Sequence, residues 1–180
     1  MTSSVSDIRS YTFAKGDQVF LDANIWLFID GPVWHHPDRR SKIYSAAFKK
    51  MRETGTTIYI DVLVLSEFIN RYARLLYGQQ AAKPPKFKDW RKTSDFKTAA
   101  QEIGTQAKKV ASKCRHIDSG FELADIEAIL KDFSTGNSDF NDQVIAELCK
   151  RENLALITND ADFRATGLRI LTANRRLLEA

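Results

Sequence analysis

The sequence lacks the features that mark several common protein classes. Its 180 residues include only two cysteines, Cys114 and Cys149, and these form no CxxC pair, which argues against a disulfide scaffold or a zinc knuckle. No apolar run approaches roughly eighteen residues, so no membrane-spanning helix is expected. The polar segment 1–18 has no apolar core of the kind found in signal peptides. A reducing, cytoplasmic location therefore fits best.

Positive charge is concentrated in one segment. The chain carries 27 bases and 23 acids, but residues 78–116 hold ten of the bases and only three of the acids. Such a segment can attract a polyanion through phosphate contacts, or it can be a solvated helical face with a basic loop. Pro84-Pro85 breaks the chain inside it and marks an insertion better than a domain boundary. We expect a single domain over 1–180 with a basic helical and loop insertion at about 78–120.

Apolar patterning predicts strands that alternate with helices. Short apolar or β-branched runs predict strands at 18–22, 57–60, 154–157 and 168–171. Helical spacing predicts helices at 25–29, 38–54, 63–77, 94–112, 121–133 and 139–151. In the helix at 121–133, the residues expected to face the core are Ala124, Ile126, Ile129, Leu130 and Phe133. This alternation is typical of βαβ units and predicts an α/β fold with a mainly parallel sheet.

Acidic residues fall where such a sheet would gather them. Asp22 directly follows the first predicted strand and Asp160 follows the strand at 154–157, so both lie at carboxyl ends of strands, where α/β sheets bind ligands. Asp139 and Asp142 are near one face of a helix start, and Glu67 lies early in an apolar helix. Each acid can also be a cap, a turn residue or an exposed glutamate. Several carboxylates at one sheet edge would nevertheless repel one another unless a cation neutralised them. Oxygen ligands without a His or Cys cluster favour Mg²⁺ or Mn²⁺ over zinc.

Four short motifs occur in an order that resembles the PIN-domain family. They are VFLDAN at 19–24, SEF at 66–68, DQVIA at 142–146 and LITNDADF at 156–163. The family includes the VapC toxins of toxin–antitoxin pairs and stand-alone RNA-processing nucleases. The resemblance covers residues 18 to about 172 and implies a three-layer α/β/α sandwich with endoribonuclease activity that depends on Mg²⁺ or Mn²⁺. The segment 78–116 departs from compact VapC-like toxins, which are shorter.

The resemblance also implies roles for individual residues. The acidic quartet that would bind the metal and carry catalysis consists of Asp22, Glu67, Asp142 and Asp160, with Asp139 and Asp162 as auxiliary ligands. Asn24 and Thr158 would orient the acids by hydrogen bonding. The bound metal would polarise the scissile phosphate and activate a water for in-line attack, so no histidine is required. His35, His36 and His116 lie away from the motifs and are interpreted as surface residues.

Basic residues near the motifs are candidates for RNA contact. Arg71 and Arg74 follow Glu67 by one and two helical turns, and they could grip the RNA backbone, remain exposed or bind an acidic partner. Three basic residues are interleaved with Trp90, and they are Lys86, Lys88 and Arg91. Such a mixture of positive charge and an aromatic ring would suit stacking on single-stranded RNA. Trp90 itself is interpreted as a local packing residue.

Two other protein classes share part of this pattern. A haloacid-dehalogenase-type phosphatase also begins with an aspartate after a strand, but it needs a second aspartate two positions later, where this chain has Asn24. A non-catalytic PIN module for RNA binding or assembly is the other alternative, although all four quartet positions are acidic here. We expect a metal-dependent endoribonuclease, most readily the toxin of a type II toxin–antitoxin pair, with a stand-alone RNA-processing nuclease as the alternative. Its expected partners are RNA, an antitoxin protein and a second copy of the chain.

Overall fold

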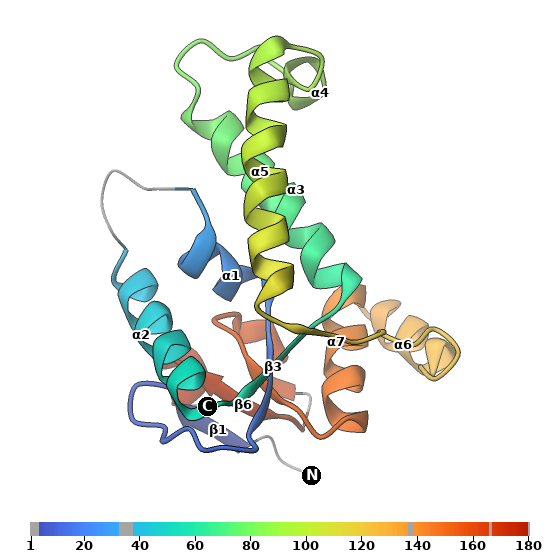
Figure 1. The fold of residues 1–180 in the computed structure, drawn as a ribbon. Coiled ribbons are helices and arrows are strands. Elements are labelled where there is room, and N and C mark those ends of the chain that lie inside the picture. The colour runs from blue at the N-terminus through green and yellow to red at the C-terminus, as the bar shows by residue number, and fades with distance from the viewer. Residues whose placement is uncertain (1–3, 33–37, 137–138, 166, 180) are drawn as a thin grey trace.

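One parallel β-sheet organises the chain. The structure is a computed structural model that describes residues 4–32, 38–136, 139–165 and 167–179 (Figure 1). Within these ranges six strands pair in parallel in the order β1-β6-β5-β2-β3-β4. Their bounds are β1 Ser4–Asp7, β2 Gln18–Leu21, β3 Thr57–Ile60, β4 Arg115–His116, β5 Ala155–Ile157 and β6 Arg169–Thr172. The predicted parallel sheet is confirmed.

The central and edge strands differ in composition. In β2 and β5 the residues Phe20, Leu21, Leu156 and Ile157 are fully buried, since both faces of the sheet are covered. The edge strands are polar and short, which discourages pairing with other chains. β1 contains the single apolar residue Val5, and β4 has two residues that are both exposed. The apolar pattern therefore identified the central strands and missed β1 and β4.

Helices cover the sheet in two groups. Their bounds are α1 Ala23–Asp30, α2 Arg39–Thr54, α3 Val62–Gln79, α4 Phe87–Trp90, α5 Ser94–Ser112, α6 Ile126–Phe133, α7 Phe140–Arg151 and α8 Arg175–Leu178, with a 3₁₀ turn η1 at Ala161–Ala165. Helix α1 packs against α2, α3 and α5, whereas α6 packs against α7, which contacts β5. This is the expected α/β/α arrangement. In the described part of the chain, no helix is long and apolar enough to cross a membrane.

Local signals set the ends of α2 as predicted. Asp38 caps its start, because the Asp38 carboxylate accepts from the backbone N–H of Arg40 at 2.9 Å. Gly55 ends the helix in the left-handed conformation, with φ of 73°. The helix extends from Arg39 to Thr54, in agreement with the prediction.

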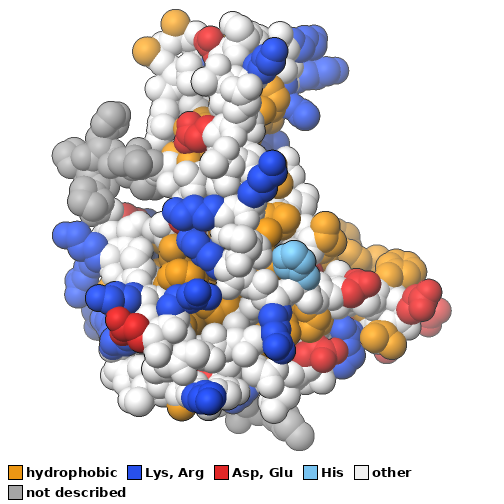
Figure 2. All heavy atoms as spheres, viewed as in Figure 1, with side chains coloured by type: hydrophobic (Ala, Val, Ile, Leu, Met, Phe, Trp, Pro, Cys, Tyr) orange, Lys and Arg blue, Asp and Glu red, His pale blue; other side chains and the backbone are white. Residues whose placement is uncertain are grey.

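The predicted helix at 121–133 is wrong at its start and in its buried face. The chain turns after Gly120, whose carbonyl accepts from the N–H groups of residues 123 and 124, and Asp125 then caps a shorter helix, α6. Leu130 and Phe133 are 50% and 49% exposed, and only Ile129 of this helix is buried. Helix α6 packs on α7 at the outer edge of the molecule, so it buries one narrow face (Figures 1 and 2).

The basic segment forms an ordered hairpin with α3. Helices α3 and α5 pack together and extend beyond the sheet, with α4 at their far end (Figure 1). Four aromatic rings hold this tip together, with neighbouring centroids 5.1–5.7 Å apart; they are Tyr77, Phe87, Trp90 and Phe96. Trp90 is 1% exposed, which confirms its interpretation as a packing residue. Basic side chains lie along the hairpin (Figure 2).

Two of these bases serve the fold. The buried carboxylate of Asp30, at the end of α1, pairs with Lys109 at 2.8 Å and with Lys113, both from α5. The ion pairs join the hairpin to the body of the molecule. Of the three histidines, His116 is exposed, as predicted. His35 and His36 lie outside the described residues.

Candidate active site

Asp22 lies at the carboxyl end of β2, beside the end of β5. Leu21 pairs with Ile157 in the sheet, so Asp22 and Thr158 are the next residues on neighbouring strands. The Thr158 hydroxyl donates to Asp22 Oδ2 at 2.7 Å, and the Asn24 amide donates to the same oxygen. Asp22 occupies the N-cap position of α1, but its side chain makes no capping hydrogen bond to that helix. Its carboxylate is therefore held by the neighbouring strand and by Asn24.

Hydrogen bonds extend from Asp22 to the loop that carries Asp160. The Asn24 amide also donates to the Thr158 hydroxyl oxygen at 3.3 Å, and Asn24 Oδ1 accepts from the backbone N–H of Asn159 at 3.2 Å. The backbone N–H of Asp160 donates to Thr158 Oγ1 at 3.0 Å. Thr158 and Asn24 thus connect the loops after β2 and β5 and fix both aspartates relative to each other.

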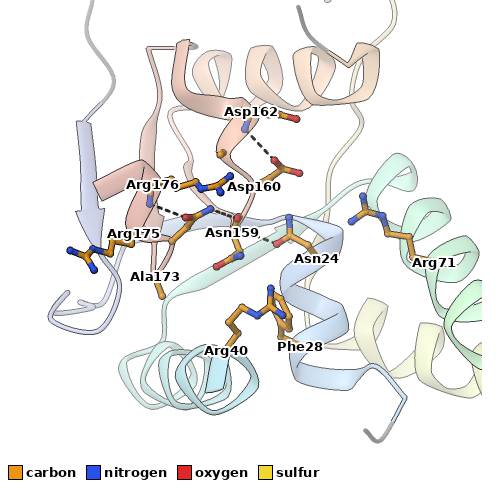
Figure 3. Close-up of a pocket in the computed structure, with 12 residues that line it drawn as sticks. Asn24, Phe28, Arg40, Arg71, Asn159, Asp160, Asp162, Ala173, Arg175 and Arg176 are labelled. Atoms are coloured by element: carbon orange, nitrogen blue, oxygen red, sulfur yellow. Dashed lines mark hydrogen bonds between the residues drawn. The ribbon is translucent and has the colours of Figure 1, made fainter. Parts of the chain in front are cut away.

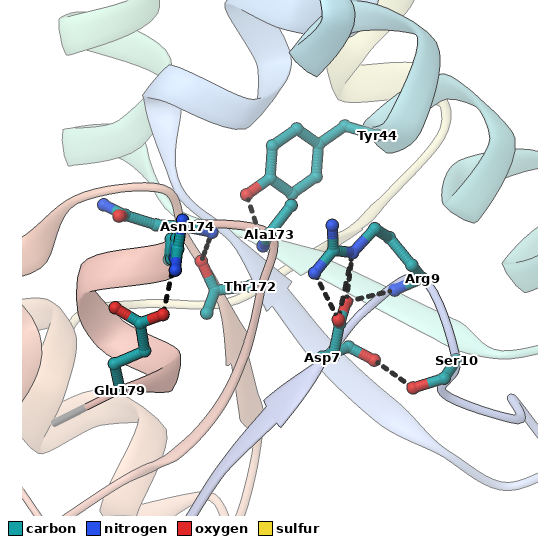
Figure 4. A network of polar contacts seen from close by, with 9 residues as sticks. Asp7, Arg9, Ser10, Tyr44, Thr172, Ala173, Asn174 and Glu179 are labelled. Atoms are coloured by element: carbon teal, nitrogen blue, oxygen red, sulfur yellow. Dashed lines mark hydrogen bonds and ion pairs between the residues drawn. The ribbon is translucent and has the colours of Figure 1, made fainter.

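A second network lies beneath this loop. The Tyr44 hydroxyl donates to Asn159 Oδ1 at 3.0 Å. It also accepts from the backbone N–H of Ala173 at 3.0 Å (Figure 4). Asn174 donates from its side-chain amide to the carbonyl of Asn159 at 2.7 Å. These bonds tie the loop after β5 to the segment after β6 and to helix α2.

Glu67 and Asp142 come from helices. Glu67 lies in the second turn of α3, where its carboxylate pairs with Arg71 at 2.9 Å. Asp142 lies in the first turn of α7 and is partly buried. Asp139 caps the same helix by accepting from the backbone N–H of Asn141 at 2.8 Å. Asp162 is exposed on η1, and its backbone N–H donates to Asp160 Oδ1 at 3.1 Å.

These acids lie close enough for their charges to affect one another's pKa values. Burial, and after it the charge of nearby carboxylates, raises the pKa of Asp142 to about 7; these carboxylates belong to Asp22, Asp139, Asp160 and Glu67. Burial raises the pKa of Asp22 to about 6, against the effect of the Thr158 hydrogen bond. Burial also raises the pKa of Glu67, although Arg71 opposes that shift. The structure therefore brings the four acids of the predicted quartet, and Asp139, to one place.

The donor set fits a hard divalent cation. Among the described residues, no three His, Cys, Asp or Glu side chains are already arranged around a common metal position. All of the candidate ligands around Asp22 and Asp142 are carboxylates. The pKa values of Asp22 and Asp142 are raised because burial and mutual repulsion disfavour their charged forms. A divalent cation with oxygen ligands would relieve that repulsion.

Two hollows adjoin the acids. One, of about 720 Å³, is lined by Asn24, Asp160 and Asp162 (Figure 3). Phe28 and Arg40 line a second side of it, Arg175 and Arg176 a third, and Arg71 lies opposite Arg175 and Arg176. The other, of about 690 Å³, contains Asp139, Asp142 and Asp162. Because Asp162 lines both, the acidic cluster lies between a hollow rich in arginine and a hollow rich in carboxylates.

The candidate RNA contacts are placed in two different regions. Arg71 lines the hollow beside the acids. The guanidinium groups of Arg74 and Arg91 lie over the rings of Phe87 and Phe96 at the hairpin tip, 4.9 and 5.6 Å from their centroids. Lys86 and Lys88 are exposed at the same tip. The tip group is thus remote from the acidic cluster (Figure 1).

Sequence reasoning missed several residues of this region. Asp61 follows β3 as Asp22 follows β2, and that position was a usable signal. Asp61 caps α3, however, by accepting from the backbone N–H of Val64 at 2.8 Å. The arginines of α2 and α8 gave no signal, because they reach the hollow only through tertiary packing; they are Arg40, Arg175 and Arg176.

Comparison with known families agrees with the geometry. The PIN domain family profile matches residues 19–168, which is well over half of the chain. The chain belongs to the PIN domain family, whose members are generally nucleases that use divalent metals. A search of curated proteins finds no match.

Proposed function

We propose that this protein is a divalent-metal-dependent endoribonuclease that hydrolyses phosphodiester bonds of RNA. The observation that supports the proposal best is the convergence of buried, mutually coupled carboxylates at the carboxyl ends of β2 and β5. We assign catalysis and metal binding to the quartet of Asp22, Glu67, Asp142 and Asp160. Asp139 and Asp162 serve as auxiliary ligands, because both border the same cluster.

Each part of the site has a distinct task. When bound, Mg²⁺ or Mn²⁺ supplies positive charge that stabilises the negative charge developing on the phosphate oxygens and makes water a better nucleophile. Thr158 and Asn24 hold Asp22 through one oxygen, Oδ2, so that its carboxylate keeps a fixed plane. Arg71 is held by Glu67 at the rim of the hollow, where it can contact a substrate phosphate.

The hairpin tip provides a second contact with a longer RNA. Lys86 and Lys88 are exposed there, beside Arg91 and the aromatic cluster. Their charge attracts the RNA backbone independently of its sequence. Arg74 lies at the tip and Arg71 lines the hollow on the same helix, α3, so an extended strand can follow the hairpin toward the site.

The activity is tested with purified protein, a mixture of RNAs and Mn²⁺. We expect fragments from the wild type and none after addition of EDTA. Asp22→Asn keeps the size of the side chain and its acceptor oxygen for Thr158 but loses the charge, and it should yield no fragments. Glu53→Gln alters an exposed carboxylate on α2 and serves as the matched control. Equal products from the wild type and Asp22→Asn, or none from either, would contradict the proposal.

We also propose that the protein is the toxin of a type II toxin–antitoxin pair, acting on cytoplasmic RNA. The motif resemblance to the PIN family, which includes the VapC toxins, supports this role, and a separate antitoxin protein and a second copy of the chain are its proposed partners. Induced expression in bacteria should arrest growth, whereas expression of Asp22→Asn should not. Unimpaired growth with an active enzyme would favour a stand-alone RNA-processing nuclease.

A further inference from the structure

Arg40 and Phe28 line one side of the hollow beside the acids, and the buried ring of Tyr44 lies behind Phe28. The guanidinium carbon of Arg40 lies 4.9 Å from the ring centroid of Phe28. The Phe28 ring is in turn nearly parallel to that of Tyr44, with 8° between planes and 5.6 Å between centroids. Phe28 and Arg40 line the same hollow as Asn24 and Asp160 (Figure 3). A planar, cationic surface therefore stands next to the proposed site of cleavage.

Arg40 is held in place yet remains open to solvent. Asp38 accepts from its Nε at 2.8 Å and from Nη2, so two parallel hydrogen bonds fix the plane of the guanidinium. The Arg40 side chain is nevertheless 53% exposed. The Ser41 hydroxyl donates to the carbonyl of Phe28 at 2.5 Å, which joins α1 and α2 at the same point. The surface is thus preorganised before any ligand arrives, and this lowers the entropic cost of binding.

The other side of the hollow carries further positive charge. Arg175 and Arg176, from α8, line it together with Asn159 and Asn174 (Figure 3). The Arg175 side chain is 87% exposed although it pairs with Glu179 at 2.5 Å. Phosphate groups suit this side, whereas a flat, uncharged ring suits the Arg40 and Phe28 side.

We propose that Arg40 and Phe28 form a stacking platform for one nucleobase of single-stranded RNA, adjacent to the bond that is cleaved, while Arg175 and Arg176 contact the backbone. This inference rests on the proposed function and assigns to Arg40 and Phe28 the contact with a base beside the cleaved bond. A base can lie on the guanidinium only when it is free of a duplex. Stacking on a guanidinium and an aromatic ring tolerates any base, so the platform gives a preference for single strands without a sequence preference.

Two other roles for Arg40 make different predictions. If it only attracts phosphate, lysine should replace it, because lysine keeps the positive charge. If the stack only joins α1 to α2, substitution should lower stability without affecting the recognition of bases. A stacking platform requires the planar group, so Arg40→Lys should behave like Arg40→Ala.

The experiment measures binding in EDTA, so that no cleavage occurs. Fluorescence anisotropy follows a labelled single-stranded RNA and an abasic strand of equal length and charge. The wild type should bind the RNA about 5- to 100-fold more tightly than the abasic strand. Arg40→Ala, Arg40→Lys and Phe28→Leu should lose most of that difference. Arg39→Ala, an exposed neighbour on α2 that does not line the hollow, should keep it.

The outcomes separate the platform from the nuclease activity. Thermal unfolding of each variant identifies loss of fold, and the ratio between the two strands remains informative for Arg40→Lys if Phe28→Leu does not fold. Equal binding of the two strands by the wild type, no binding of either, or a wild-type ratio in Arg40→Lys would overturn the platform. Base-dependent binding without cleavage in Mn²⁺ would keep the platform and overturn the proposed function. Cleavage by a wild type that binds both strands equally would keep the proposed function and overturn the platform.

Discussion

Thr158 connects three parts of the site through a single hydroxyl group. It donates to Asp22 at 2.7 Å and accepts from the backbone N–H of Asp160 at 3.0 Å and from Asn24 at 3.3 Å. Thr158→Val keeps the shape of the side chain but removes every one of these bonds. The carboxylate of Asp22 then loses a partner in a buried position, where an unmade hydrogen bond is costly.

We predict that Thr158→Val lowers kcat by about 10- to 100-fold and raises the Mn²⁺ concentration needed for half-maximal activity. Thr158→Ser should retain most of the activity, because it keeps the hydroxyl. Steady-state cleavage assays at several Mn²⁺ concentrations measure both quantities. Thr105→Val changes an exposed threonine on α5 and is the control. Wild-type constants in the valine variant would show that the hydroxyl does not position the acids.

Asp142 links the charge of the site to the stability of the fold. Burial and its acidic neighbours raise its pKa to about 7 in the absence of metal, well above that of an aspartate in an unfolded chain. The folded state then binds a proton more tightly than the unfolded state. Ionisation of Asp142 therefore lowers the free energy of unfolding. This loss is absent below about pH 4 and grows as the pH rises to about 7. Asp22, with a pKa of about 6, contributes in the same direction.

We therefore predict that Asp142→Asn is more stable than the wild type at pH 7.5 in EDTA, by a few degrees in Tm, and that this advantage disappears toward pH 4. Added Mn²⁺ should raise the Tm of the wild type more than that of the variant, because the carboxylate binds the cation. Differential scanning fluorimetry across this pH range tests both statements. An unchanged difference in Tm between pH 4 and 7.5 would contradict the assigned origin of the shift.

At the residue scale, the sequence was most informative about residues that come directly after a strand. The positions of Asp22 and Asp160 after their strands predicted that both lie at one edge of the sheet, because the carboxyl ends of parallel strands meet there, whereas Thr158 was named through the family resemblance. Arg40 and Phe28 could not be found in this way. Their approach depends on how α1 packs on α2, and no spacing within the chain encodes that crossing.

Among the elements, the hairpin of α3 and α5 depends on one buried ionic contact. Asp30 has a side chain that is 4% exposed, and it pairs with Lys109 and Lys113. Lys113 also lies 5.2 Å from the ring centroid of Phe48, so it is enclosed on more than one side. Removing the carboxylate would leave Lys113, whose side chain is 21% exposed, without its counter-ion, which is unfavourable for a largely buried cation, whereas Lys109 is 55% exposed.

We predict that Asp30→Asn lowers the free energy of unfolding by about 3 kcal/mol. Asp89→Asn, which breaks an exposed pair with Lys92 at 3.5 Å, should lower it by less than about 1 kcal/mol. Urea unfolding followed by circular dichroism gives both values. Similar losses in the two variants would mean that the contact at Asp30 does not anchor the hairpin.

The elements also show where patterning succeeds and where it fails. Helix α2 has a capping aspartate, a left-handed glycine and a regular apolar face, and its bounds were predicted closely. Helix α6 was predicted too long, since apolar residues at 121 and 123 belong to a turn and stay exposed. Strand β1 was missed because an edge strand exposes polar residues on both sides, and its pairing with β6 joins distant parts of the chain.

For the whole molecule, sheet order brings the acids together. Strands β2 and β5 lie side by side at the centre although they are far apart in the sequence, and α3 and α7 begin beside their carboxyl ends. The hollow rich in arginine lies on one side of the cluster, and the hairpin extends from the same region (Figures 1 and 3). This arrangement suits an RNA strand that passes through the site and continues along the hairpin, so cleavage should not require a free end.

Cleavage of a circular single-stranded RNA in Mn²⁺ is the most direct test of the central claim, since a circle has no end from which an exonuclease could begin. We predict that the wild type and Glu53→Gln convert the circle to a linear strand and then to shorter fragments, whereas Asp142→Asn leaves it intact. A circle that survives the wild-type protein in Mn²⁺, or that Asp142→Asn opens at the wild-type rate, would contradict the assignment of this acidic cluster as an endoribonuclease site.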